Sequence, residues 1–330
     1  MELNCQPHAR QSTYGDSLPA TYTSEEISER LRRGMDKGVL SFPLTAFDAD
    51  GRVDLDGFRA HLRTQIAAGP GAVFPCCGTG EFFSLAEDEY ATLIKAAVEE
   101  ADGALPVVAG AGYGWAQAAR FAAAAERAGA DALLLLPPYL AETPQRGLVE
   151  HVRRVAASTA LPIIVYQRAQ VRIDVATVPA LAEIPNVIGV KDGHSDLDRL
   201  QRIKLAAPSE WLFFNGAATA EMQARAYSSI GVPAYSSAVH AFAPEIAGAF
   251  FRAFHAGDQV RVDQLLKEFY VPLVELRDQG SGYAVSLVKA GARLRGANVG
   301  SVRAPLVDPA PEHLRALEGL LTTGLALAAA

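Results

Sequence analysis

The sequence predicts an α/β protein folded as a (β/α)8 barrel, with additional helices after the barrel and a short N-terminal extension. Eight short apolar runs alternate with segments whose apolar residues recur every three or four positions, the patterns of strands and amphipathic helices. Parallel strands need such helical crossovers, and eight of them close into a barrel. The expected strands are Val39–Phe47, Ala72–Cys77, Leu105–Gly110, Ala132–Pro137, Leu161–Gln167, Val187–Lys191, Trp211–Asn215 and Val232–Ser237.

A doubly wound open sheet is the alternative arrangement of alternating strands and helices. That fold usually places a glycine-rich phosphate turn after its first strand, whereas the first apolar run here includes Phe42-Pro43-Leu44-Thr45 and no such turn follows. The length of 330 residues also suits a single barrel. Among the expected crossover helices are Asp54–Ala68, Glu87–Ala101, Ala116–Ala128 and Arg146–Ala157.

The two ends of the chain are expected to lie outside the barrel. Residues 1–22 are polar and irregular, and Thr23 then opens a capping box with Glu26, so we expect a helix that runs to Arg33 and is stopped by Gly34. Three further helices are expected after the barrel. The resulting division is 1–34 for the N-terminal extension, 35–256 for the barrel and 257–330 for the C-terminal helices, which are Asp258–Leu276, Ser281–Leu294 and Pro311–Leu320.

Composition excludes several classes of function. The net charge is −7, and no basic cluster is longer than pairs such as Arg32-Arg33, which argues against a nucleic-acid partner. The three cysteines include the adjacent pair Cys76-Cys77 and are no disulfide framework, so a reducing compartment is expected. The N-terminus lacks the apolar core of a signal peptide, and the apolar tail is too short to span a bilayer. We therefore expect a cytoplasmic protein without a membrane partner.

Lys191 is the first candidate catalytic residue. It ends the apolar run Val187–Val190 and is followed by Asp192 and Gly193, so its ammonium is expected at the end of a buried strand. Burial there is costly unless the group is paired, solvated from one side or used as a neutral amine. Only six of the thirty basic residues are Lys, and an amine can form an imine where a guanidinium cannot. A strand-capping Lys that reaches solvent fits the position equally well.

Other candidates stand at the carboxyl ends of the expected strands, where active sites of this fold lie. Gly78, Thr79 and Gly80 could bind a substrate carboxylate through their N–H groups, and an ordinary loop is an equal alternative. Tyr166 could be a core residue or a proton relay to Lys191. Arg168 could offer a bidentate fork to a carboxylate or form a surface salt bridge.

Neutral polar side chains end the last two strands. Asn215, Ser236 and Ser237 suit a hydroxylated or carboxylate-bearing substrate. A metal site would draw on Glu81, Asp192, His194 and His240, but these residues show no ligand spacing, and a neighbouring Lys would repel a cation. We therefore expect no metal and no organic cofactor.

Several motifs together resemble the dihydrodipicolinate synthase and N-acetylneuraminate lyase superfamily. They are Gly78-Thr79-Gly80-Glu81, Tyr166 and Gly189-Val190-Lys191-Asp192, and the resemblance covers roughly residues 38–296. It implies a Schiff-base lyase on a (β/α)8 barrel, with Lys191 as the imine-forming residue and Tyr166 as its proton relay. A homodimer or homotetramer is implied as well.

Within that superfamily, longer matches resemble the 5-dehydro-4-deoxyglucarate dehydratase subgroup. They include Gly80–Leu85, Ala234–Ala238 and Gly282–Lys289. Two positions depart from the family patterns. Leu140 replaces the second tyrosine of the synthases, and Gln167 stands where the subgroup is expected to carry Asn.

The subgroup resemblance implies a keto sugar acid as substrate. The implied reaction dehydrates and decarboxylates 5-dehydro-4-deoxy-D-glucarate to 2,5-dioxopentanoate. The same residues would serve an aldolase that cleaves a 2-keto-3-deoxy sugar acid and releases pyruvate. A non-catalytic barrel that senses a keto acid is the third possibility.

Overall fold

The computed structural model describes residues 22–330, and it confirms the predicted barrel. Its parallel strands form two hydrogen-bonded sheets, of order β3-β4-β5-β6-β7 and β2-β1-β8. Parallel bridges between Val73 and Val107 and between Asn215 and Tyr235 join the sheets at both edges, so the barrel closes. The strands are β1 Leu40–Ser41, β2 Ala72–Val73, β3 Val108–Ala111, β4 Ala132–Leu135, β5 Ile163–Gln167, β6 Val187–Asp192, β7 Leu212–Asn215 and β8 Ser236–Ser237.

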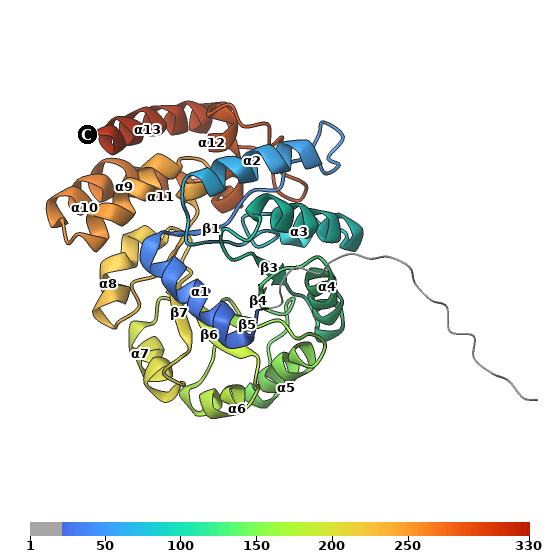
Figure 1. The fold of residues 1–330 in the computed structure, drawn as a ribbon. Coiled ribbons are helices and arrows are strands. Elements are labelled where there is room, and N and C mark those ends of the chain that lie inside the picture. The colour runs from blue at the N-terminus through green and yellow to red at the C-terminus, as the bar shows by residue number, and fades with distance from the viewer. Residues whose placement is uncertain (1–21) are drawn as a thin grey trace, which may run out of the picture.

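Helices surround this barrel as the crossover rule requires (Figure 1). Their apolar faces pack on the outside of the strands, while a second apolar cluster, including Leu40, Phe74 and Ile164, fills the inside. The crossover helices are α2 Leu55–Ala67, α3 Glu87–Ala101, α4 Trp115–Arg127, α5 Gln145–Ala156, α6 Val178–Ala182, α7 Leu197–Ala206, α8 Ala224–Ser229 and α9 Pro244–His255.

Helix α1, Ser24–Lys37, closes the barrel at the amino ends of the strands. The predicted capping box of Thr23 and Glu26 is confirmed, but the predicted stop at Gly34 is wrong, because the helix runs through it. A Cβ on Gly34 would lie 2.1 Å from the carbonyl oxygen of Gly71. This glycine therefore allows close approach of two backbones rather than ending the helix.

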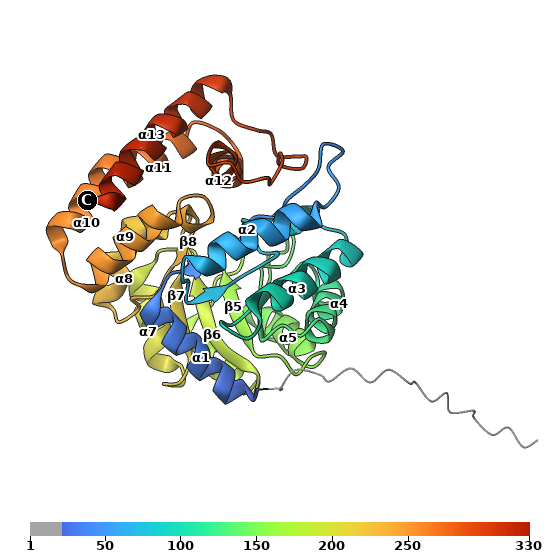
Figure 2. The ribbon, with the colours of Figure 1, turned by 45° about the horizontal axis from the view of Figure 1, so that its top comes forward.

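The C-terminal helices gather on one side of the barrel (Figure 2). The single helix expected over Asp258–Leu276 is interrupted by a π-helical turn, Leu266–Tyr270, and Pro272 just beyond it lacks the N–H that a regular helix needs. The last helix continues past Leu320 to Ala329. The helices are α10 Gln259–Leu265, α11 Val271–Arg277, α12 Tyr283–Leu294 and α13 Pro311–Ala329.

No helix within residues 22–330 is both long enough and apolar enough to cross a membrane. Residues 1–21, including Cys5 and all but one residue of the segment expected to be irregular, lie outside the described residues.

Candidate active site

Three side chains from neighbouring strands meet inside the carboxyl end of the barrel. The parallel register pairs Tyr166 with Lys191, and Lys191 with Phe214. Since residues on one level of a parallel sheet point to the same face, all three side chains enter the barrel together. The sequence predicts that Tyr166 and Lys191 lie close together, and the strand register explains how they do.

Aromatic rings surround the amine of Lys191. Its Nζ lies 3.8 Å from the centre of the Phe42 ring and 4.4 Å from that of Tyr166. Only 5% of the residue is exposed. Burial lowers the pKa of Lys191 to about 7, and the positive charge of Arg168 acts in the same direction, while Cys77 opposes it. A substantial fraction of this amine is therefore neutral and nucleophilic near neutral pH.

Gly216 makes room for the lysine side chain. A Cβ at this position would lie 2.4 Å from Cε of Lys191 and 2.6 Å from its Cγ. The residue follows β7 directly, so the close approach is between the lysine and the loop after β7. Gly216 was not identified from the sequence as a residue of the site, although its lack of a side chain fixes the path of Lys191.

Tyr166 is held in a defined orientation by two hydrogen bonds. Its hydroxyl donates to the carbonyl oxygen of Gly216 at 3.0 Å and accepts from Nη1 of Arg168 at 3.3 Å. Burial raises the pKa of the Tyr166 phenol, and Arg168 partly offsets this shift. The phenol is therefore protonated at neutral pH and can act as a proton donor beside the lysine.

A cavity of about 270 Å³ opens above these side chains. Gly78 and Thr79 line it, and a Cβ on Gly78 would meet no atom within 4 Å, so the backbone of this turn is open to a ligand. Gly80, predicted to bind substrate with them, does not line the cavity. It lies against the backbone of the preceding loops, and its carbonyl oxygen accepts from the hydroxyl of Thr45 at 2.6 Å.

Two more predicted substrate ligands also point away from the cavity. The side-chain amide of Asn215 donates to the carbonyl of Ala220 and accepts from the N–H of Ala217. The hydroxyl of Ser237 donates to the buried carboxyl of Glu221. Ser236, by contrast, does line the cavity. Neither Asn215 nor Ser237 lines the cavity, and both side chains bind the protein itself.

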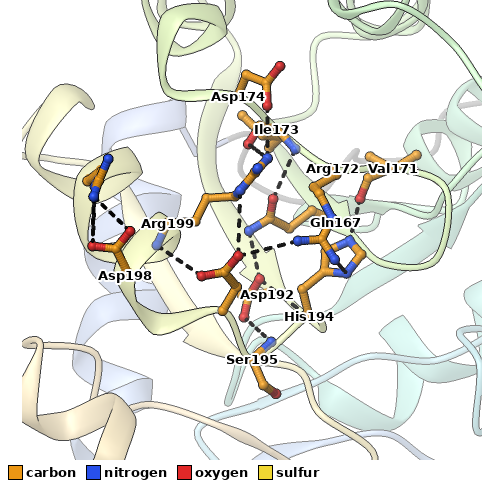
Figure 3. Close-up of polar contacts among 12 residues, drawn as sticks. Gln167, Val171, Arg172, Ile173, Asp174, Asp192, His194, Ser195, Asp198 and Arg199 are labelled. Atoms are coloured by element: carbon orange, nitrogen blue, oxygen red, sulfur yellow. Dashed lines mark hydrogen bonds and ion pairs between the residues drawn. The ribbon is translucent and has the colours of Figure 1, made fainter.

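The position that departs from the subgroup pattern, Gln167, follows the inward-facing Tyr166, so alternation turns its side chain to the outer face of β5. There it contacts Asp192 (Figure 3). Its side-chain nitrogen donates to Oδ1 of Asp192 at 2.6 Å, and its oxygen accepts from the N–H of Ile173 at 3.1 Å. Asp192 also accepts from the N–H of Ser195 at 3.0 Å. Gln167 thus connects the loop after β5 to Asp192, which in turn binds the loop after β6. These contacts lie on the opposite face of the strands from Tyr166 and Lys191.

Of the candidates weighed for a metal site, only Asp192 and His194 lie close together, where the N–H of His194 donates to Oδ1 of Asp192 at 3.4 Å. His194 contacts the carbonyl oxygen of Val171, and His240 contacts Gln65 and Ser41, while Glu81 forms an ion pair with a lysine. Across residues 22–330, no three His, Cys, Asp or Glu side chains come close enough to hold a metal ion.

That buried ion pair connects the barrel to helix α12. Nζ of Lys289 lies 2.7 Å from Oε1 of Glu81, and both side chains are fully buried. Oε2 of Glu81 accepts from the N–H of Arg303 at 2.9 Å. Glu81 directly follows the Gly78–Gly80 turn, so the C-terminal segment holds the end of the turn that lines the cavity.

Helices α11 and α12 also supply part of the cavity wall. The lining includes Arg277 from α11 and Tyr283 and Leu287 from α12. In the sequence, the segment Gly282–Lys289 stands out only as a motif, and nothing marks Arg277 as part of a site. The signal was weak because helices beyond the eighth crossover have no fixed place in a barrel.

The model of the dihydrodipicolinate synthetase family matches residues 35–323. The chain belongs to the dihydrodipicolinate synthetase family. The family match covers the barrel and most of the C-terminal helices, so the resemblance inferred from the motifs is confirmed.

Relatives with similar sequences carry a more specific name. The chain is 67% identical over 304 residues to "Probable 5-dehydro-4-deoxyglucarate dehydratase 2" of Streptomyces avermitilis, covering 92% of each chain. It is 54% identical to the "Probable 5-dehydro-4-deoxyglucarate dehydratase" of Streptomyces griseus, covering 93% of this chain and 97% of the other. The crystal structure of dihydrodipicolinate synthase from Oceanobacillus iheyensis has the same fold, with a TM-score of 0.82 at 24% identity over 91% of this chain and 99% of that one.

Proposed function

We propose that this protein dehydrates and decarboxylates 5-dehydro-4-deoxy-D-glucarate to 2,5-dioxopentanoate, carbon dioxide and water. The names and high identity of the Streptomyces relatives support this hydro-lyase activity. The observation that carries the mechanism is the amine of Lys191, buried among aromatic rings at the cavity floor with a pKa of about 7.

The first step is attack of the neutral Lys191 amine on the keto carbon of the substrate. Loss of water from the adduct gives a protonated imine, and the phenol of Tyr166 donates the proton that lets the hydroxyl leave. Arg168 supports this role because its hydrogen bond orients the phenol and stabilises the phenolate formed when the proton is given up. The phenolate recovers a proton in the next step.

The protonated imine then serves as an electron sink for two eliminations. It acidifies the neighbouring methylene, and a base (Tyr166 or a substrate carboxylate) removes a proton to give an enamine. The enamine expels the hydroxyl on the following carbon, which takes up that proton and leaves as water. The new double bond is conjugated with the imine. The distal carboxylate can therefore leave as carbon dioxide, with its electron pair flowing through that double bond into the iminium. Protonation and hydrolysis release 2,5-dioxopentanoate and regenerate Lys191.

The open backbone of Gly78 and Thr79 would bind the carboxylate beside the imine. Arg168 and Ser236, which also line the cavity, would bind the distal half of the substrate. Gly80, Asn215 and Ser237 would act only by positioning the loops that carry these groups.

The test combines product analysis with chemical trapping. Incubation with 5-dehydro-4-deoxyglucarate should release carbon dioxide and 2,5-dioxopentanoate, whereas release of pyruvate would indicate the aldolase. Borohydride should reduce the imine and add the keto acid covalently to the wild type and to Lys95→Ala, a control at an exposed lysine. Lys191→Ala should take up none. Covalent addition of the keto acid to Lys191→Ala, or no addition to the wild type, would refute the mechanism.

We also propose a cytoplasmic homodimer or homotetramer, the assemblies that the family resemblance implies. Light scattering in solution measures the subunit count, and cell fractionation locates the protein.

A further inference from the structure

Arg277 brings a positive charge to the cavity from a helix outside the barrel. It lies in the last turn of α11, within the C-terminal helices, and it lines the same cavity as Lys191 and Arg168. In the described part of the chain, these three are the charged residues of the cavity lining, and none is acidic. The whole chain carries a net charge of −7, so the positive cavity is a local feature that favours an anion of more than one charge.

Both arginines are held around the loop that follows β7. Nη1 of Arg277 donates to Oγ1 of Thr219 at 2.8 Å and to the carbonyl oxygen of Ala218 at 3.3 Å. The same loop begins at Gly216, whose carbonyl accepts from the Tyr166 hydroxyl that also binds Arg168. Both guanidinium groups are therefore anchored to the loop after β7. Arg168, which follows β5, is connected to it through Tyr166, and Arg277 from α11 binds it directly.

The remaining edge of the Arg277 guanidinium already binds a carboxylate. Nε and Nη2 lie 2.9 and 2.8 Å from Oδ1 of Asp278, the next residue in the chain. The side chain of Asp278 is 63% exposed, that of Arg277 is 23% exposed, and Asp278 does not line the cavity. An exposed ion pair of this kind contributes little stability, so a substrate carboxylate can replace Asp278 on that edge.

We propose that Arg277 determines specificity for keto acids that carry a second, distal carboxylate. On binding, the guanidinium releases Asp278 and binds the distal carboxylate of the substrate, opposite Arg168. This inference rests on the proposed function for the identity of the natural substrate, but the preference for dianions follows from the cavity charges alone. The appended helices thus supply the selectivity, while the barrel supplies the imine chemistry.

The test uses two ligands that cannot undergo the reaction. 2-Oxoadipate has a keto group beside one carboxylate and a second carboxylate at the far end, and 2-oxohexanoate has a methyl group there instead. Calorimetric titration of both ligands measures the ratio of their dissociation constants for the wild type, Arg277→Met and Arg225→Met. Arg225 is the matched control, because it also joins the barrel to the C-terminal helices, through Asp263, but lies outside the cavity.

The wild type and Arg225→Met should bind the dianion at least about tenfold more tightly, the scale of one charge-assisted hydrogen-bonded pair, and Arg277→Met should lose this preference. Asp278→Asn should tighten dianion binding without changing 2-oxohexanoate binding, because it removes the competing carboxylate. A purely structural role for Arg277 cannot produce this opposite effect.

A wild type without preference, an Arg277→Met protein that keeps it, or equal losses for both ligands would overturn the proposal. If Arg277→Met does not fold, as judged by thermal unfolding, Asp278→Asn alone decides the question. Since no turnover is measured, the proposed function can fail in its own product assay while this preference stands.

Discussion

Replacing Gly216 with Ala should disable the enzyme while leaving its fold intact. The added Cβ would lie 2.4 Å from Cε of Lys191, and ordinary contact begins at 3.4 Å, so the lysine side chain must move by about 1 Å. The carbonyl oxygen of Asp192, at 3.0 Å, needs a smaller adjustment. Gly216 does not have a positive φ, so Ala itself introduces no backbone strain.

A nucleophile displaced by about 1 Å costs about 100-fold in rate, so kcat should fall by roughly that factor. A lysine forced from its preferred rotamer costs about 0.5–1.5 kcal/mol, so the free energy of unfolding should change by no more than about 1.5 kcal/mol. Steady-state kinetics and urea denaturation measure the two quantities.

The matched control is Gly114→Ala, where the added Cβ meets no atom within 4 Å and the backbone φ of −67° suits alanine. Its kcat should match the wild type. If Gly216→Ala keeps full activity, or if its activity falls only because the protein unfolds, the assignment of Gly216 as the residue that fixes the path of Lys191 is refuted.

Three further predictions follow from the buried charges. Because burial lowers the pKa of Lys191 to about 7, the single-turnover rate of imine formation should rise with pH up to about 7 and then level off; a rate that climbs steadily toward pH 10 would contradict a depressed lysine pKa. Burial raises the pKa of Glu221 from its usual 4.5 to about 7. The neutral carboxyl group therefore stabilises the folded protein at low pH. This contribution to the free energy of unfolding is lost as the pH rises from 4.5 to about 7, at about 1.4 kcal/mol per pH unit. Glu221→Gln should therefore gain stability relative to the wild type between pH 5 and pH 8 in urea denaturation, and parallel curves would show that the carboxyl is not perturbed. Lys289→Met should destabilise the protein by about 3–5 kcal/mol by leaving Glu81 buried without its partner, and adding Glu81→Gln should recover part of the loss; equal stability of the single and double variants would mean that the pair is not coupled.

The barrel could be predicted because the burial of its strands and helices produces regular patterns in the sequence. Buried strands appear as short apolar runs, and half-buried helices appear as apolar residues every three or four positions, so both can be recognised in a single sequence. Strand lengths were less predictable. The first strand was expected to extend from Val39 to Phe47, yet regular pairing covers only Leu40–Ser41. Pro43 lacks the N–H needed to extend the ladder, and Phe47 pairs in antiparallel fashion with Val53 instead.

The contribution of the C-terminal helices could not be predicted, because it depends on tertiary docking. Arg277 has no neighbour in the sequence that identifies it as part of a cavity. Its position depends on the π-helical turn before α11 and on its hydrogen bonds to the loop after β7. Thr219 in that loop precedes Arg277 by 58 residues. A contact between residues so far apart in the chain produces no local sequence pattern.

The outward placement of Asn215 and Ser237, in contrast, follows from alternation along the strands combined with the strand register. Once Lys191 is taken to face the cavity, alternation sends Asp192 to the outer face. In a parallel barrel, residues paired with Asp192 share its face, and Asn215 is paired with it. The same rule across β1 and β8 pairs Ser236 with Leu40, which lies inside the barrel, and Ser237 with Ser41. The inward-facing Lys191 and the strand register together therefore determine which polar side chains at the strand ends face the cavity. Among the residues that end these strands, Tyr166 and Ser236 line it.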